Sequence, residues 1–95
     1  MTGNTLTEFI NDLLIAGGPE KEFVYHEKKF FLESIYHDDK ELIEMHIFEI
    51  SNENTPVISF FGKNFQECVK QFEEAHIFDG KTIYDVEKEI TVLFG

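Results

Sequence analysis

The sequence predicts an α+β domain: a four-stranded antiparallel β-meander with one N-terminal helix and two C-terminal helices, in the order α-β-β-β-β-α-α. Two observations predict this class. Aromatic and β-branched runs follow one another with only short polar turns between them, and runs with helical spacing lie at both ends of the chain. Such segregation is typical of helices packed on an antiparallel sheet. With 95 residues, the chain is expected to form a single domain over 1–95.

The first helix is expected at residues 5–16. Thr5-Leu6-Thr7-Glu8 is a capping-box sequence, in which Thr5 and Glu8 satisfy each other's backbone N–H groups. Apolar residues then follow at the spacing of one helical face: Leu6, Phe9, Ile10, Leu13 and Leu14. Gly17-Gly18-Pro19 is expected to end the helix, because proline cannot continue it.

Four strands are expected next, at 22–25, 30–36, 41–51 and 57–61. The segments between them are rich in polar turn residues: 26–29, 37–40 and 51–55. Pro56 is tolerated because it precedes the first residue of the fourth strand. Short turns between consecutive strands predict a meander.

Two helices are expected after the strands. Asn64 caps the first of them with Glu67 three positions on, and its apolar face is Phe65, Cys68, Val69, Phe72 and Ala75. Asp79-Gly80 interrupts the pattern. Thr82 and Asp85 are then expected to cap a third helix, with the apolar stripe Ile83, Val86, Ile90 and Leu93.

The charge is strongly acidic and excludes some classes of partner. Nineteen acidic residues face eight basic ones, all of them lysines, for a net charge of −11. Arginine supplies the planar fork that reads phosphates and guanine edges, and it is missing. We therefore expect no direct binding to nucleic acid or to an anionic membrane.

The cysteine content and the hydropathy pattern indicate a compartment. A single cysteine, Cys68, forms no internal disulfide and rules out a multi-cysteine zinc cluster. The sequence begins without the basic segment of a signal peptide, and no apolar run reaches the roughly 18 residues of a membrane span. We expect a protein of the reducing cytoplasm.

Two short motifs suggest chemistry but have simpler interpretations. Gly80-Lys81-Thr82 resembles the end of a phosphate-binding loop, yet Ala75 stands where that motif needs glycine, so a turn between helices is favoured. Cys68 lies near a helix start, where a thiol can be activated. Because it shares a face with Phe65 and Phe72, a buried structural thiol is the better interpretation.

Other candidate sites lack the spacing that their chemistry requires. Four histidines carry no metal-binding pattern, and the best metal candidate is the turn His37-Asp38-Asp39, which lacks the spacing of a calcium loop. Adjacent acids such as Glu73-Glu74 point to different sides of a helix and do not converge on a substrate. None of the three serines lies in a nucleophile elbow. We expect no catalytic residue, no metal and no cofactor.

The predicted sheet is apolar on both faces, whereas a meander with one solvated face should alternate cleanly. Either helices cover both faces, or an apolar patch stays open and marks an interface. A β-bulge near Ile47-Phe48 is a local alternative. The candidate interface residues are Phe30, Leu32, Tyr36, Leu42, Phe48 and Ile50.

The sequence therefore favours a non-enzymatic interaction module that binds another protein or itself. One alternative is an acidic inhibitor or immunity-type protein that mimics nucleic acid and binds a basic enzyme, which requires acids in rows on one face. Another is a small metal-binding protein or enzyme using His37, Asp38 or Cys68, which requires one cleft that joins them.

Overall fold

The computed structural model describes residues 1–15, 20–52 and 54–94, which form an α+β fold with a five-stranded antiparallel sheet. The elements in chain order are α1 (Leu6–Leu13), β1 (Lys21–Tyr25), β2 (Lys28–His37), the 3₁₀ turn η1 (Asp38–Lys40), β3 (Leu42–Glu49), β4 (Ile58–Gly62), α2 (Phe65–Glu74), the 3₁₀ turn η2 (Glu87–Glu89) and β5 (Ile90–Phe94). The strand order in the sheet is β4-β3-β2-β1-β5.

Helix α1 begins as the sequence predicts. Thr5 Oγ1 accepts a hydrogen bond from the backbone N–H of Glu8 at 3.1 Å, and Glu8 Oε1 accepts one from the N–H of Thr5 at 2.9 Å. The helix ends at Leu13, earlier than the predicted residue 16, and Leu14 is its C-cap. The predicted stop at 17–19 lies outside the described residues.

The meander of β1 to β4 is confirmed, and its first turn is tighter than expected. His26 and Glu27 alone form it, both with positive φ (47° and 68°), which suits the twist of two-residue hairpins. Strand β2 therefore begins at Lys28 rather than at residue 30. The β2–β3 register runs without a shift, so no bulge interrupts this pairing at Ile47 and Phe48.

The predicted third helix is wrong, because the segment forms a turn and a fifth strand. Thr82 and Asp85 do bond to each other, through Thr82 N–H to Asp85 Oδ2 at 3.0 Å and Asp85 N–H to Thr82 Oγ1 at 3.4 Å, but they close a single turn. The last residues, Ile90–Phe94, are β-branched or apolar and pair with β1. Ile83 and Val86 are buried, as the predicted helical stripe requires, whereas Leu93 is exposed.

The second helix is confirmed. Asn64 Oδ1 accepts a hydrogen bond from the N–H of Glu67 at 2.9 Å. The side chain of Glu67 reaches one residue further back than a capping box requires, since its Oε1 accepts from the N–H of Lys63 at 3.0 Å. The buried face of α2 comprises Phe65, Cys68, Val69 and Phe72.

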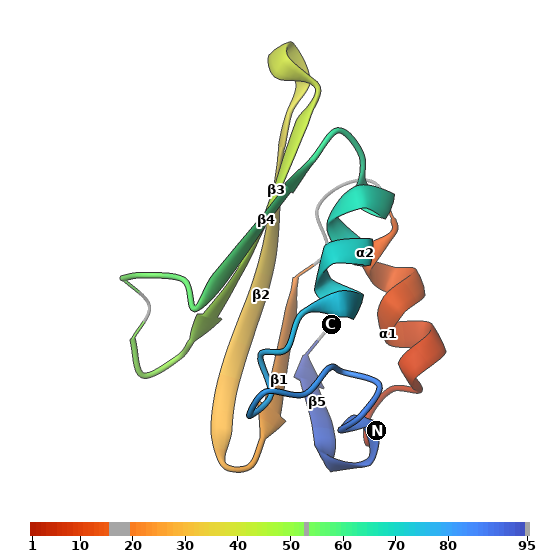
Figure 1. The fold of residues 1–95 in the computed structure, drawn as a ribbon, viewed down its shortest axis with the longest axis vertical. Helices are drawn as coiled ribbons and strands as arrows, with labels where there is room; N and C mark the ends of the chain where they lie inside the picture. Colours follow the sequence, from red (N-terminus) through yellow and green to blue (C-terminus); the bar gives the residue numbers. More distant parts are fainter. Residues whose placement is uncertain (16–19, 53, 95) are drawn as a thin grey trace.

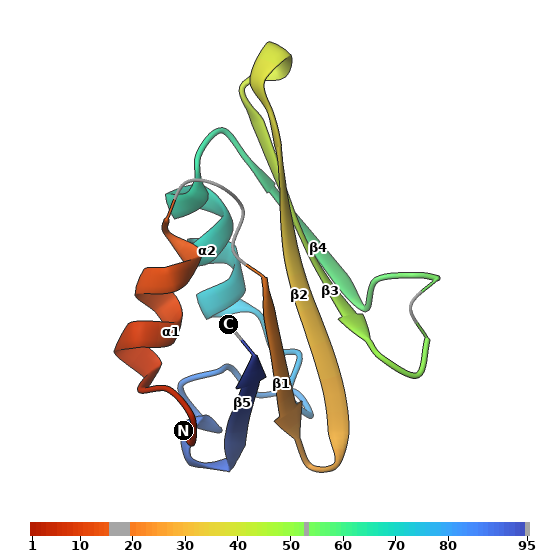
Figure 2. The same cartoon turned by 180° about the vertical axis from the view of Figure 1, so that it is seen from behind.

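Both helices lie on the same face of the sheet (Figures 1 and 2). The core between these layers is rich in aromatic rings, with Phe23 at its centre against Phe9 and Phe30 at 5.6 and 5.5 Å between ring centroids. The β2–β3 hairpin extends past the helices to η1 (Figure 1). One face of the sheet is thus covered, and the other bears no described helix.

The N-terminal segment closes the outer edge of β5. Thr2 N–H donates to Ile90 O at 2.9 Å, and Val92 N–H donates to Thr2 O at 2.8 Å. Gly3 is required there, because it has a φ of 89° and a Cβ atom would lie 2.4 Å from Val92 O. A sheet edge that is paired in this way does not offer its backbone to another chain.

Lys21 is a buried charge that belongs to no motif recognised in the sequence. Its side chain is 1% exposed, and its Nζ donates to Asp12 Oδ2 at 2.9 Å and to Asn4 Oδ1 at 3.2 Å. The ammonium group also lies 5.0 Å from the centre of the Phe9 ring. Lys21 therefore joins the start of β1 to α1 through a paired charge.

Candidate functional site

The candidate site is the sheet face that no described helix covers, called the open face below. Successive side chains of a strand point to opposite faces, and those on the open face alternate with core residues such as Phe23, Leu32 and Met45. The open face consists of Glu22, Val24, Lys29, Phe31, Glu33, Ile35, His37, Leu42, Glu44, His46, Phe48, Ile50, Ser59, Phe61, Thr91 and Leu93.

The six predicted interface residues belong to two different faces. Phe30 and Leu32 are buried under the helices, so they belong to the core and are not accessible to a partner. Tyr36 shares their face but is 53% exposed, because the hairpin extends past the helices there. Leu42, Phe48 and Ile50 lie on the open face and are partly exposed. The expectation that helices cover both faces is also wrong, since α1 and α2 share one.

The strand register brings two rows of open-face residues together across β2, β3 and β4. In the first row, Glu44 pairs with Ile35 on one side and with Phe61 on the other. In the second, His46 pairs with Glu33 and Ser59. Directly opposed side chains on one face lie about 4.5–5.5 Å apart at Cβ. The centre of the open face therefore alternates between an apolar row with a carboxylate in its middle and a polar row.

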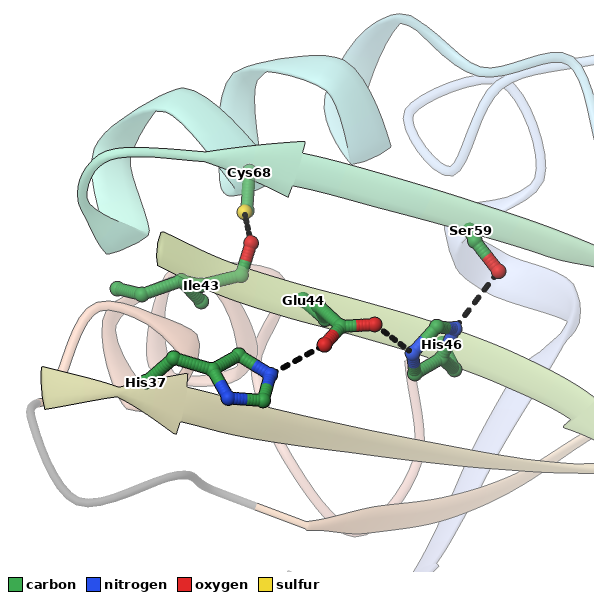
Figure 3. Close-up of polar contacts among 6 residues, drawn as sticks. All are labelled: His37, Ile43, Glu44, His46, Ser59 and Cys68. Carbon is green, nitrogen blue, oxygen red and sulfur yellow. Dashed lines mark hydrogen bonds and ion pairs between the residues drawn. The ribbon is translucent and has the colours of Figure 1, made fainter. Parts of the chain in front are cut away.

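A hydrogen-bonded network of His37, Glu44, His46 and Ser59 runs across these rows (Figure 3). Glu44 Oε2 contacts His37 Nε2, Glu44 Oε1 lies 3.2 Å from His46 Nε2, and His46 Nδ1 lies 2.7 Å from Ser59 Oγ. With neutral imidazoles, both Nε2 atoms donate to Glu44 and Ser59 donates to His46. We call this set the histidine network.

Glu44 is the electrostatic centre of the histidine network. The hydrogen bond from His37 is the main cause that lowers the pKa of the Glu44 carboxyl below its ordinary value, partial burial opposes the shift, and the bond from His46 adds to it. The side chain of Glu44 is 24% exposed. The open face thus holds an ionised carboxylate with an apolar side chain directly across on each neighbouring strand, Ile35 and Phe61.

Ser59, His46 and Glu44 have the composition of a hydrolytic triad. Acyl transfer also needs hydrogen-bond donors aimed at the developing oxyanion. Around Ser59, the backbone N–H groups of β3 and β4 lie in the plane of the sheet and do not point out of its face. The network can polarise the Ser59 hydroxyl, but the paired strands supply no such donors beside it.

The other predicted candidates lie apart from the histidine network. Within the described ranges, no three His, Cys, Asp or Glu side chains gather as metal ligands, and His37 turns toward Glu44 rather than toward Asp38 and Asp39. Cys68 is buried on the helix side, where its Sγ donates to Ile43 O at 3.5 Å (Figure 3). Burial raises the pKa of the Cys68 thiol, which opposes a nucleophilic role. Cys68 and His37 lie on opposite sides of the sheet, so no cleft joins them.

The remaining motifs have local structural roles. Gly80 has a φ of 79° in a tight turn where Phe78 N–H donates to Lys81 O at 3.1 Å, which confirms the interpretation of this segment as a turn. His26 contacts Glu89, and His76 Nδ1 lies 2.9 Å from Gly80 O. Both histidines are exposed. His46 differs from them because its side chain is mostly buried.

Sequence reasoning missed the histidine network. Glu44 and His46 are two residues apart on a predicted strand, so the sequence predicts that they lie on the same face of the sheet. His37 and Ser59 join them only through the β2–β3 and β3–β4 registers, which a single sequence does not specify.

Comparison of the chain with protein-family models, with curated proteins and with solved structures finds no match in any of the three. In the described part of the chain, neither helix has the length and apolar character needed to cross a membrane. The open face is therefore the feature of the molecule from which a function can be inferred.

Proposed function

We propose that this chain is a non-enzymatic protein–protein interaction module that binds its partner through the open face. The observation that carries the proposal is a sheet face with uncovered apolar side chains: Ile35 is 41% and Phe61 52% exposed, and further apolar residues of this face are partly exposed. These further residues are Phe31, Leu42, Phe48 and Ile50. Exposed apolar side chains gathered on one face of a small domain are typical of an interface.

The charge on the open face favours a different protein over a second copy as the partner. Glu22, Glu33 and Glu44 stand there against Lys29, and the whole chain has a net charge of −11. Two copies docked face to face would bring like charges into a desolvated interface, which costs binding energy. A partner with an apolar patch bordered by positive side chains complements this face.

Mimicry of nucleic acid is less well supported. That function needs acids in rows on one face, whereas they lie on every part of the fold: Glu8 and Asp12 on α1, Asp38 and Asp39 in η1, Glu67 and Glu74 on α2, and Glu87 and Glu89 in η2. A dispersed negative charge is accounted for by solubility. A basic partner enzyme remains compatible with binding at the open face.

Affinity purification with matched variants tests the proposal. The tagged protein, its Phe48→Asp variant and its Ile15→Asp variant are compared in cells of the source organism by quantitative mass spectrometry. Ile15 is exposed at the end of α1 and serves as the control. We expect partners that are lost with Phe48→Asp and kept with Ile15→Asp. Partners that are kept with Phe48→Asp, or lost equally with both variants, contradict the proposal.

Light scattering with size-exclusion chromatography separates the two kinds of occupant. A monomer at micromolar concentration agrees with a partner of different sequence. A dimer that Phe48→Asp dissociates instead identifies a second copy as the occupant of the open face.

A further inference from the structure

We propose that Glu44, with Ile35 and Phe61 on either side, forms a subsite for a cationic side chain, an arginine or lysine, of the partner. This inference rests on the proposed function and names the chemistry that the open face recognises. The subsite extends across three adjacent strands, from β2 through β3 to the edge strand β4.

The geometry suits a cation with an apolar stem. Ile35 and Phe61 are directly across from Glu44 on β2 and β4, and both are well exposed. Arginine and lysine side chains pack their methylene groups on apolar surface while the charged head reaches a polar group. An exposed aromatic ring such as that of Phe61 can also attract a positive charge. A carboxylate between two exposed apolar groups therefore complements both the charged head and the methylene stem of such a side chain.

The hydrogen bonds within the histidine network leave Glu44 able to accept more. A carboxylate has about four acceptor positions on its two oxygens. His37 and His46 each occupy one oxygen of Glu44. These two contacts fix the direction of the carboxylate. A guanidinium or ammonium group can then bond to the remaining acceptor positions, as charge-assisted hydrogen bonds.

The other charged groups of the open face do not neutralise Glu44. Glu33 is directly across from His46 and adds a second negative charge, and Glu22 adds a third on β1. Lys29, at the other end of β2, is four residues from Glu33, which is roughly 13 Å along a strand. The facing residues of β4, Ser59 and Phe61, are uncharged. Beyond His37, η1 adds Asp38, Asp39 and one positive charge, Lys40.

Benzamidinium and benzamide are a matched pair of probes for this subsite. Both carry an aromatic ring, and only the first is a cation. Binding to the isotope-labelled protein is followed by two-dimensional NMR at pH 7.5, for the wild type, Glu44→Gln and the control Glu74→Gln. Glu74 is exposed at the end of α2, on the helix side.

We expect benzamidinium to shift the signals of β3 and β4 around Glu44 and to bind about fivefold more tightly than benzamide, since an ion pair contributes up to about 1 kcal/mol at a surface. Glu44→Gln should remove this difference, and Glu74→Gln should leave it unchanged. The comparison of the two probes on the wild type needs no variant, so it decides the question even if Glu44→Gln does not fold.

Three results would overturn the subsite. They are equal affinities of the two probes, benzamidinium shifts confined to other acids, and a preference for benzamidinium that survives Glu44→Gln. Equal affinities at the open face overturn the cation subsite alone, because they still show that the face binds apolar groups. A failure of the proposed function would appear instead in the Phe48→Asp purification.

Discussion

Phe61 on β4 lies directly across from Glu44 on β3, so an exposed ring and a partly buried carboxylate lie side by side on one sheet face. This pairing gives the open face both an apolar area and a fixed negative charge. Binding proteins combine these two properties when affinity and specificity are both required.

The two faces of the sheet should respond differently to the loss of a phenylalanine ring. Phe30 is buried in the core, so Phe30→Ala should lower the free energy of unfolding by about 3–5 kcal/mol. Phe61→Ala removes a ring that is half exposed and should cost less than about 1.5 kcal/mol. Urea denaturation followed by circular dichroism measures both values. Equal losses in the two variants would show that the open face is part of a core.

The contribution of Glu44 to stability should depend on pH in one direction. Its pKa in the folded state lies below the ordinary value of 4.5, so the ionised form stabilises the fold above that pH. This contribution is lost as the pH falls through the folded-state pKa. The melting temperatures of wild type and Glu44→Gln should therefore differ most near pH 6 and converge toward pH 3. A difference that grows on acidification would contradict the network geometry.

The N-cap of α1 should be a measurable source of stability. Thr5→Ala removes the acceptor of the Glu8 N–H bond and should cost about 1 kcal/mol. Thr7→Ala is the matched control, because Thr7 is exposed within the same helix. Thermal unfolding of the two variants gives the comparison. Equal melting temperatures would show that the capping box does not contribute.

Lys21 should matter although it lies far from the open face. Lys21→Met keeps the apolar stem and removes the ammonium group that bonds to Asp12 and Asn4. Because Asp12 is partly exposed and can be hydrated, we expect a loss of about 1–2 kcal/mol rather than more. Lys70→Met on the exposed side of α2 is the control. An unchanged free energy of unfolding would mean that water replaces the bonds to Lys21.

The sequence predicts the elements whose signals are local. The caps at Thr5 and Asn64 involve residues three positions apart, and the meander follows from polar turns between apolar runs. The C-terminal segment misleads because a helix and a turn followed by a strand both bury Ile83, Val86 and Ile90. The pairing of β5 with β1 spans most of the chain and leaves no local signal. Pairing with β1 therefore determines that the end of this segment forms a strand and not a helix.

The candidate site depends on nonlocal information to a greater extent. Alternation along β2 and β3 shows that both faces carry apolar residues, but it does not show which face the helices cover. For this reason the predicted interface combines Phe30 and Leu32 with Leu42 and Phe48, which lie on the opposite face of the sheet. The histidine network needs two strand registers to be known at once. Sequence alone could therefore indicate that a face is open, and could not indicate its composition.

Site-specific photo-crosslinking tests the central claim most directly. A benzoylphenylalanine residue is placed in living cells at position 61 on the open face, or at position 84 beside α1, where Tyr84 is similarly exposed. We predict a crosslinked partner from position 61 and not from position 84. Crosslinks from position 84 alone would contradict an interface at the open face.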